Sequence, residues 1–235
     1  MNVKAYEKYL TSELLMGPSC LRILKELLDR SPLSLSPDQA VLDLGCGKGL
    51  TSLAIAKEIG GRVYANDLWV EPEENAKRFA EWGVDKQICP MHENANDLTL
   101  AKEQLDALIS IDAYHYFGTG KGFFKEKILP FLKKGATVLI GVPGIKNEFD
   151  GRAEELLCDW LGNTSYMFRS PNEWKQIIGT HEQIDSAEVW EMDCFSHAWQ
   201  EWFDTKHMYA VGDKQFFDTL IKPYTCFVGI CIKLK

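Results

Sequence analysis

The sequence predicts an α/β fold in which a parallel sheet is covered by helices on both faces. Short, nearly continuous apolar runs alternate with segments of helical spacing along residues 20–143. Continuous apolar strands that alternate with helices are typical of a parallel sheet buried on both sides. A glycine-rich turn, Gly45-Cys46-Gly47-Lys48-Gly49, follows the first apolar run. The chain of 235 residues is long enough to form one core as a single domain.

The first units of the chain are a helix, a strand, a turn and a second helix. Residues 20–29 carry leucines at helical spacing and predict a helix that ends before Ser31-Pro32. Residues 41–44 form a short apolar strand that leads into the glycine turn. Residues 50–59 then predict a helix that is stopped by Gly60-Gly61.

The second and third strands follow at residues 62–65 and about 87–92. Between them, Pro72 with its acidic neighbours suits the first turn of a helix, which closes at Gly83. The third strand contains Pro90. Because proline has no N–H to donate to a neighbouring strand, this strand is expected at an edge of the sheet.

The fourth and fifth strands are expected at residues 105–111 and 136–142, with a helix over 119–134 between them. The pattern loosens after Gly144. Ser170-Pro171-Asn172-Glu173 then has the form of a capping box with proline at the first helical position, which predicts a helix to about residue 180.

The end of the chain predicts two more strands, at residues 186–192 and 224–234, separated by an aromatic-rich insertion at about 193–222. Trp199 and Trp202, three residues apart, share a face of any helix there. The aromatic set indicates a pocket closed by aromatic side chains or the interface of a homodimer, and core packing of that face is the competing interpretation.

Composition restricts the partners. The chain has 26 Lys and Arg against 34 Asp and Glu, a net charge of −8, which disfavours binding to nucleic acid or anionic membranes. No apolar run approaches the ~18–20 residues that span a bilayer, and the first ten residues lack the apolar core of a signal peptide, so a cytoplasmic location is expected. The cysteines show no C-x-x-C, and neither disulfides nor a metal site is expected.

The glycine turn predicts a ligand site at the carboxyl end of the first strand, where open α/β sheets bind their ligands. A dinucleotide fingerprint, G-x-G-x-x-G, would place a glycine at position 50, but the chain has Leu50. Asp43 adds negative charge where a pyrophosphate would lie, which favours a ligand with a cationic end. Asp67, directly after the second strand, suits the two hydroxyls of a ribose.

Asp43 to Gly49 fits the motif D-x-G-C-G-x-G, and the chain here resembles the class I S-adenosylmethionine-dependent methyltransferases, in particular small bacterial domains that act on metabolites. The resemblance extends over residues 38–143 through three further segments: Val63-Tyr64-Ala65-Asn66-Asp67, the run His92 to Leu98 that resembles G-D-A-x-x-L, and Leu105-Asp106-Ala107-Leu108. Asn94 stands where the family usually has an acidic residue facing the adenine amine.

The resemblance implies a Rossmann-like, doubly wound sheet of seven strands in the order 3-2-1-4-5-7-6, with the last strand antiparallel and a helical insertion before it. It divides the single domain into an N-terminal helical cap (1–37), a cofactor-binding core (38–143) and a substrate-side half (144–235). Leu15, Met16 and Gly17, with Tyr6 and Tyr9, are expected to fold over the cofactor. The residues implied to bind S-adenosyl-L-methionine are Asp43, Gly45, Cys46, Gly47, Gly49, Asp67, Leu68, Trp69, Asn94, Ala95 and Ser110.

Methyl transfer from a sulfonium is an in-line displacement, so catalysis comes mainly from positioning, and a base is needed only for an acceptor that is protonated. The expected function is transfer of a methyl group to a small-molecule acceptor. Tyr114 and His115, after the fourth strand, are the candidate catalytic residues, and Asp112 is a candidate polar contact or a helix cap. The candidate substrate-binding residues are Tyr114, His115, Tyr116, Trp199 and Trp202.

Three alternatives remain open from the sequence: an NAD-dependent oxidoreductase, which the glycine spacing disfavours; a non-catalytic S-adenosylmethionine-binding protein; and a nucleic-acid methyltransferase. The negative charge disfavours the last, as does the segment Asp112-Ala113-Tyr114-His115 in place of [DNS]-P-P-[YF]. Cyclopropane formation on lipids and arsenite methylation are minor alternatives.

Overall fold

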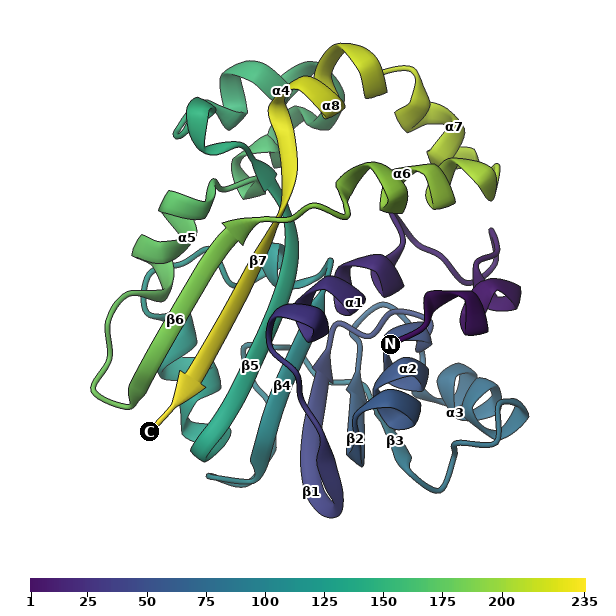
Figure 1. Cartoon of the computed structure of the whole chain (residues 1–235), viewed down its shortest axis with the longest axis vertical. Helices are drawn as coiled ribbons and strands as arrows, with labels where there is room; N and C mark the ends of the chain where they lie inside the picture. Colours follow the sequence, from purple (N-terminus) through teal and green to yellow (C-terminus); the bar gives the residue numbers. More distant parts are fainter.

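The computed structural model describes residues 1–235 and contains one sheet of seven strands in the order β3-β2-β1-β4-β5-β7-β6 (Figure 1). The predicted strand order is confirmed. Neighbouring strands are parallel except at β7, which is antiparallel to both β5 and β6. The strands are β1 (Leu35–Leu44), β2 (Gly60–Asn66), β3 (Ile88–Met91), β4 (Leu105–Ile111), β5 (Leu132–Ile145), β6 (Ile184–Glu191) and β7 (Thr225–Leu234).

Helices cover both faces of the sheet. Side chains of successive strand residues point to opposite faces, so Val41 belongs to the core under one layer of helices and Leu42 to the core under the other. The first layer contains α1 (Cys20–Arg30), α2 (Leu50–Glu58) and α3 (Pro72–Glu81), which lie on the near side in Figure 1. The second contains a π-helical turn (Phe124–Ile128) and α5 (Pro171–Ile178).

Two local predictions are confirmed by hydrogen bonds and pairing. The Ser170 hydroxyl accepts from the backbone N–H of Glu173, whose carboxylate accepts from the Ser170 N–H, so the capping box starts α5. Pro90 of β3 pairs with Ala65 of β2, and β3 lies at the edge of the sheet as predicted.

The helix predicted over 119–134 is wrong in its extent. The structure has the π-helical turn Phe124–Ile128, a 3-10 turn at Leu129–Phe131, and then β5 from Leu132. Pro130 explains the difference, because its ring and its missing N–H prevent a regular helix from continuing through it. Lys133 and Lys134 therefore lie in the first part of β5 rather than at a helix end.

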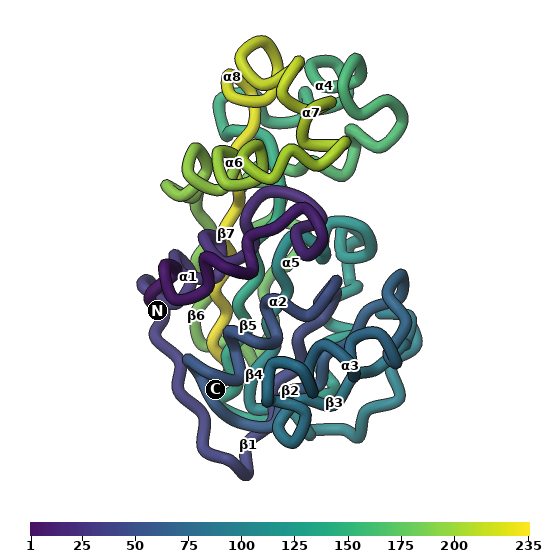
Figure 2. Tube along the Cα trace, turned by 90° about the vertical axis from the view of Figure 1, so that its right-hand side faces the viewer, coloured from purple at the N-terminus to yellow at the C-terminus, as the bar shows by residue number.

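A group of helices lies beyond the carboxyl ends of β4 and β5 (Figures 1 and 2). It consists of α4 (Ala153–Leu161), which the sequence pattern did not predict, and of the insertion before β7. The insertion is helical as expected and contains α6 (Phe195–Asp204), α7 (Met208–Lys214), a π-helical turn (Phe217–Ile221) and α8 (Lys222–Tyr224). None of the helices is both long and apolar enough to cross a bilayer.

Candidate functional site

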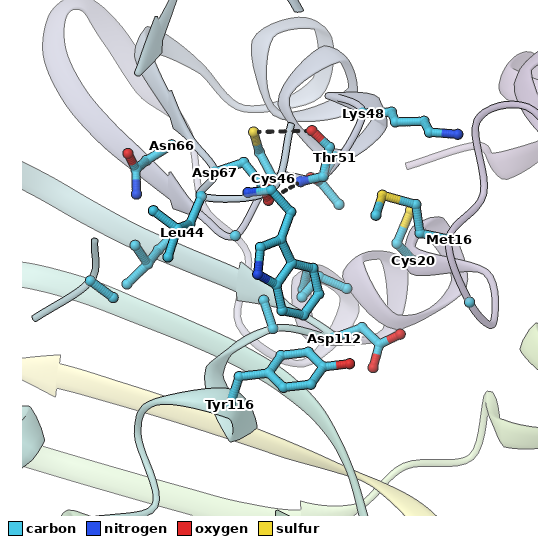
Figure 3. A pocket seen from close by; sticks show the side chains of 18 of the residues that line it. Met16, Cys20, Leu44, Cys46, Lys48, Thr51, Asn66, Asp67, Asp112 and Tyr116 are labelled. Atoms are coloured by element: carbon cyan, nitrogen blue, oxygen red, sulfur yellow. Dashed lines mark hydrogen bonds between the residues drawn. The ribbon is translucent and has the colours of Figure 1, made fainter. Parts of the chain in front are cut away.

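A cavity of about 370 Å³ lies at the carboxyl ends of β1, β2 and β4. This is the crevice in which open α/β sheets bind their ligands, and the size suits a small molecule (~300–1,000 Å³). Figure 3 shows its labelled side chains converging from several elements. The walls come from residues 14–20, the glycine turn 44–51, the segments 66–69 and 93–96, and the segment 111–117 after β4.

The glycine turn is held in a conformation that other residues adopt poorly. Gly45, Gly47 and Gly49 all have φ between +53° and +81°, the left-handed region that glycine enters without steric cost. A Cβ on Gly45 would lie 2.2 Å from the Cβ of Ala113. The absence of a side chain therefore lets the segment after β4 pack directly against the turn.

Asp67 connects this turn to the end of β2. Its Oδ2 accepts a hydrogen bond from the Gly47 N–H (2.8 Å), and its Oδ1 accepts from the N–H groups of Trp69 (2.8 Å) and Val70 (3.0 Å). The side chain lines the cavity. A carboxylate has about four acceptor positions, so Asp67 keeps capacity for a ligand hydroxyl.

Three of the residues implied to bind the cofactor lie behind the cavity wall. Asp43 is fully buried and its Oδ2 accepts from the hydroxyls of Thr51 and Ser52, both at 2.6 Å. Burial raises the pKa of Asp43 to about 6. Gly49 packs against the Phe79 ring, and the Ser110 hydroxyl donates to the Leu44 carbonyl (2.6 Å). Asp43, Gly49 and Ser110 therefore support the turn and do not line the cavity.

The other residues of that set form the cavity wall. Leu68 and Trp69 are 49% and 65% exposed at its mouth, where an apolar ligand face would cover them. Asn94 also lines the cavity, and its Oδ1 accepts from the Asn96 N–H (2.9 Å). The wall residues from the predicted set are Gly45, Cys46, Gly47, Asp67, Leu68, Trp69, Asn94 and Ala95.

The structure does not bring Tyr114 and His115 to the cavity. Tyr114 is completely buried and packs against Phe117 and Trp174. His115 is 4% exposed, and burial lowers its pKa to about 3, so the imidazole is neutral. Neither side chain lines the cavity.

The backbone conformation after β4 explains why Tyr114 and His115 do not line the cavity. Residues 114–116 form a 3-10 turn rather than a continued strand. Positions three apart share a side of such a turn, so Ala113 and Tyr116 line the cavity while the residues between them point inward. Asp112, from the first position after β4, also lines it.

Trp199 and Trp202 also lie away from the cavity. Both are buried in the core between α6 and its neighbours, and the Trp202 Nε1–H donates to Asp213 at 3.1 Å. Trp199 packs against Trp160 and Phe217. The aromatic side chains of the insertion are therefore largely core, with Tyr209 an exception at 67% exposure.

The N-terminal segment covers the cavity in part as expected. Leu15, Met16 and Gly17 line it, whereas the Tyr6 hydroxyl donates to Glu58 (2.8 Å) and Tyr9 packs on Trp82. Some wall residues were not predicted as site residues although they lie within the motifs, namely Lys48, Glu93 and Asn96. Others lie outside any motif, namely Leu14, Pro18, Cys20 and Thr51.

Comparisons with known proteins agree with this geometry. Residues 41–135 match the family described as "Methyltransferase domain". Ribosomal protein L11 methyltransferase from Pelobacter propionicus is 41% identical over 58 residues, which are 25% of this chain and 18% of that protein. The match thus spans less than a fifth of the curated relative's length.

Two solved structures share the fold. Geranyl diphosphate C-methyltransferase from Streptomyces coelicolor A3(2) has a TM-score of 0.71 at 16% identity, with 89% of this chain and 74% of that chain covered. Phosphoethanolamine N-methyltransferase 2 from Haemonchus contortus has a TM-score of 0.72 at 18% identity, with 98% and 56% covered.

The sheet has the strand order that the sequence led us to expect, and the match to the methyltransferase domain covers residues 41–135. These residues contain both the glycine turn and Asp67. The family match therefore covers the side of the cavity built from β1 and β2.

Proposed function

We propose that this chain binds S-adenosyl-L-methionine in the cavity and transfers its methyl group to a small-molecule acceptor. The proposal rests on the position of Asp67. Its carboxylate lines the cavity at the end of β2 and accepts a hydrogen bond from the Gly47 N–H of the glycine turn. A carboxylate in this place suits a ribose, and the adjoining turn lets a ligand approach the backbone closely.

The charge of the wall supports a cationic cofactor. Asp67, Glu93 and Asp112 line the cavity against a single basic residue, Lys48. The Lys48 ammonium donates to the Glu13 carbonyl and is thereby drawn toward the N-terminal segment. A sulfonium with an ammonium group is attracted to such a wall, whereas a dinucleotide pyrophosphate would be repelled by it.

We place the ribose at Asp67, the adenine between Leu68, Trp69 and Asn94, and the methionine part over Gly45 to Gly47. The bound cofactor supplies an electrophilic methyl group. The protein's own contribution is to hold an acceptor in line with it and to exclude water. Met16 and Gly17 from the N-terminal segment provide the cover.

We expect a small acceptor because the cavity has a volume of about 370 Å³, part of which the cofactor has to occupy. The net charge of −8 further disfavours a polyanionic acceptor. With all seven cysteines unpaired, we propose that the protein works in the reducing environment of the cytoplasm.

Calorimetric titration with S-adenosylmethionine and S-adenosylhomocysteine tests the cofactor. We expect micromolar binding to the wild type and a loss of at least ~10-fold in Asp67→Ala, because hydrogen bonds to a charged group contribute ~1.5–3 kcal/mol. Asp185→Ala, an exposed carboxylate on β6, is the matched control and should bind normally. Absence of binding to the wild type, or tighter binding of NADH, would overturn the proposal.

A further inference from the structure

We propose that the methyl acceptor is an amine, which enters the cavity as an ammonium ion and is held there by Asp112 beside the aromatic ring of Tyr116. The ammonium gives one proton to the Asp112 carboxylate, and the neutral nitrogen then attacks the methyl group while the electron pair of the broken C–S bond stays on the sulfur. The inference rests on the proposed function and specifies its substrate class. Its evidence lies at Asp112 and Tyr116, which have no part in the proposed positions of the ribose and the adenine, and Trp69 is the one wall residue that borders both positions.

Asp112 is fixed in place by the backbone around it. It has φ +55°, an uncommon conformation for a residue with a side chain, and its N–H donates to the Gly141 carbonyl at 2.7 Å. A Cβ on Gly17 would lie 2.8 Å from the Asp112 Oδ2, so the N-terminal segment closes directly over the carboxylate. The carboxylate is therefore held at the cavity wall under a cover.

Asp112 differs from the other carboxylates of the wall in having no donor. Asp67 accepts three backbone N–H groups, and Glu93 accepts the N–H (2.8 Å) and the hydroxyl of Thr99. No hydrogen bond or ion pair of the protein reaches the Asp112 side chain, and the Lys48 ammonium donates to Glu13 instead. A half-buried carboxylate without a partner is costly, and a bound cation would satisfy it.

The burial of the Asp112 carboxylate also favours the binding of a cation. Desolvation raises the pKa of Asp112 to about 7, and the negative charge of Asp213 adds to the increase. An ammonium ion beside it would stabilise the ionised form and bring the pKa back down. The site is thus one in which a cation contributes more than a neutral group of the same shape.

Aromatic rings complete the environment. Tyr116 and Trp69 meet edge to face with their ring centroids 4.9 Å apart, and both line the cavity. Figure 3 shows the hydroxyl end of Tyr116 directed toward Asp112. Ammonium groups are attracted to aromatic faces by ~0.5–2 kcal/mol. The wall contains no arginine, which disfavours phosphorylated or carboxylated acceptors whose charge would need a bidentate partner.

Binding of a matched pair of probes tests the inference. Wild-type protein saturated with S-adenosylhomocysteine is titrated with benzylamine and with benzyl alcohol, which differ in the ammonium group. We expect the amine to bind at least ~10-fold more tightly, a difference of about 1.4 kcal/mol. In Asp112→Asn the preference should disappear, while the Asp185→Asn control keeps it.

The affinity of each variant for S-adenosylhomocysteine separates the possible failures. If the wild type does not bind S-adenosylhomocysteine, the proposed function itself has failed. If the wild type binds it but binds the two probes equally, or if Asp112→Asn retains the preference, the amine proposal is wrong. If Asp112→Asn weakens S-adenosylhomocysteine ~10-fold or more, Asp112 serves the amino group of the cofactor rather than the acceptor, which also overturns the proposal.

Discussion

Two carboxylates at the ends of neighbouring strands are held in opposite ways. Asp67 is surrounded by backbone donors and joins the second strand to the glycine turn. Asp112 lines the same cavity without any donor from the protein. The Asp67 carboxylate has hydrogen-bond donors before a ligand binds, and the Asp112 carboxylate has none. We therefore expect the two residues to respond differently to substitution.

Replacing Asp112 should change the pH dependence of stability. Its pKa is raised to about 7 in the folded protein from 3.8, so the folded state retains the proton longer than the unfolded state. The corresponding part of the unfolding free energy is complete below about pH 4 and is lost as the pH rises through about 7. Asp112→Asn lacks this loss and should be more stable than wild type at about pH 8, by on the order of 2 kcal/mol.

Urea denaturation at about pH 5 and pH 8 measures the effect, with the advantage of Asn over wild type larger at the higher pH. The other titratable groups that face Asp112 are Cys20, Tyr116 and Asp213. Burial raises the pKa of the Cys20 thiol and of Tyr116, the latter to about 12, so both stay neutral in this range. An equal difference at the two pH values would contradict the assignment.

At the scale of elements, the turn between β1 and α2 is the part that needs specific residues. Gly45 has φ +79° and touches Ala113, whereas Gly83, after α3, has φ +69° with no atom within 4 Å of its Cβ position. Both glycines therefore adopt a left-handed backbone conformation, but only Gly45 has a close neighbour at its Cβ position.

Alanine at these two glycines should separate strain from contact. Gly83→Ala is expected to cost about 1–2 kcal/mol of unfolding free energy, the penalty of a left-handed residue. Gly45→Ala should cost roughly 2–5 kcal/mol, because its Cβ also collides with Ala113. Chemical denaturation of both variants provides the comparison. Equal losses would mean that the approach of the segment after β4 does not restrict position 45.

Asp213 joins the helices beyond the sheet. Its two oxygens accept from the indole N–H groups of Trp160 in α4 (3.0 Å) and Trp202 in α6 (3.1 Å). Asp213→Ala would leave two indoles without an acceptor, at an expected cost of about 2–4 kcal/mol. The midpoint of urea denaturation should fall accordingly, and the exposed Asp218→Ala should leave it unchanged. A wild-type midpoint in Asp213→Ala would show that this connection contributes nothing.

The sequence was most informative where one physical signal dominated. Segments of strand-like composition were predicted for all seven strands, and Pro90 predicted the edge, because a residue without an N–H has few other positions in a sheet. The prediction of a helix over 119–134 was wrong at Pro130. The apolar spacing there is still helical, but proline prevents the backbone from continuing as a regular helix. Helix α4 has no capping box and was missed.

The site could be predicted on the β1–β2 side and not on the β4 side. The glycine turn and Asp67 follow from backbone conformation and strand ends, which spacing reveals. Which of the residues 112–116 face the cavity depends on a 3-10 turn that follows β4. Tyr114 and His115 have suitable side chains for the chemistry but are buried away from the cavity, whereas Asp112, a candidate polar contact or helix cap, lines it.

In the whole molecule, the sheet separates two hydrophobic cores. The cavity opens at the edge of the sheet where the parallel strands β1, β2 and β4 have their carboxyl ends. The N-terminal segment crosses this end and the helical insertion lies beside it (Figure 2). The cavity wall beside Asp112 is thus assembled from chain segments far apart in sequence, whereas the wall beside Asp67 comes from residues 44–96.

A crystal structure with S-adenosylhomocysteine would show whether the cavity at the ends of β1, β2 and β4 is the S-adenosylmethionine site. We expect the ribose hydroxyls within hydrogen-bonding distance of Asp67, the adenine beside Trp69 and Asn94, and the sulfur on the side of Asp112. Density for the ligand outside this cavity, or a ribose without contact to Asp67, would contradict this expectation.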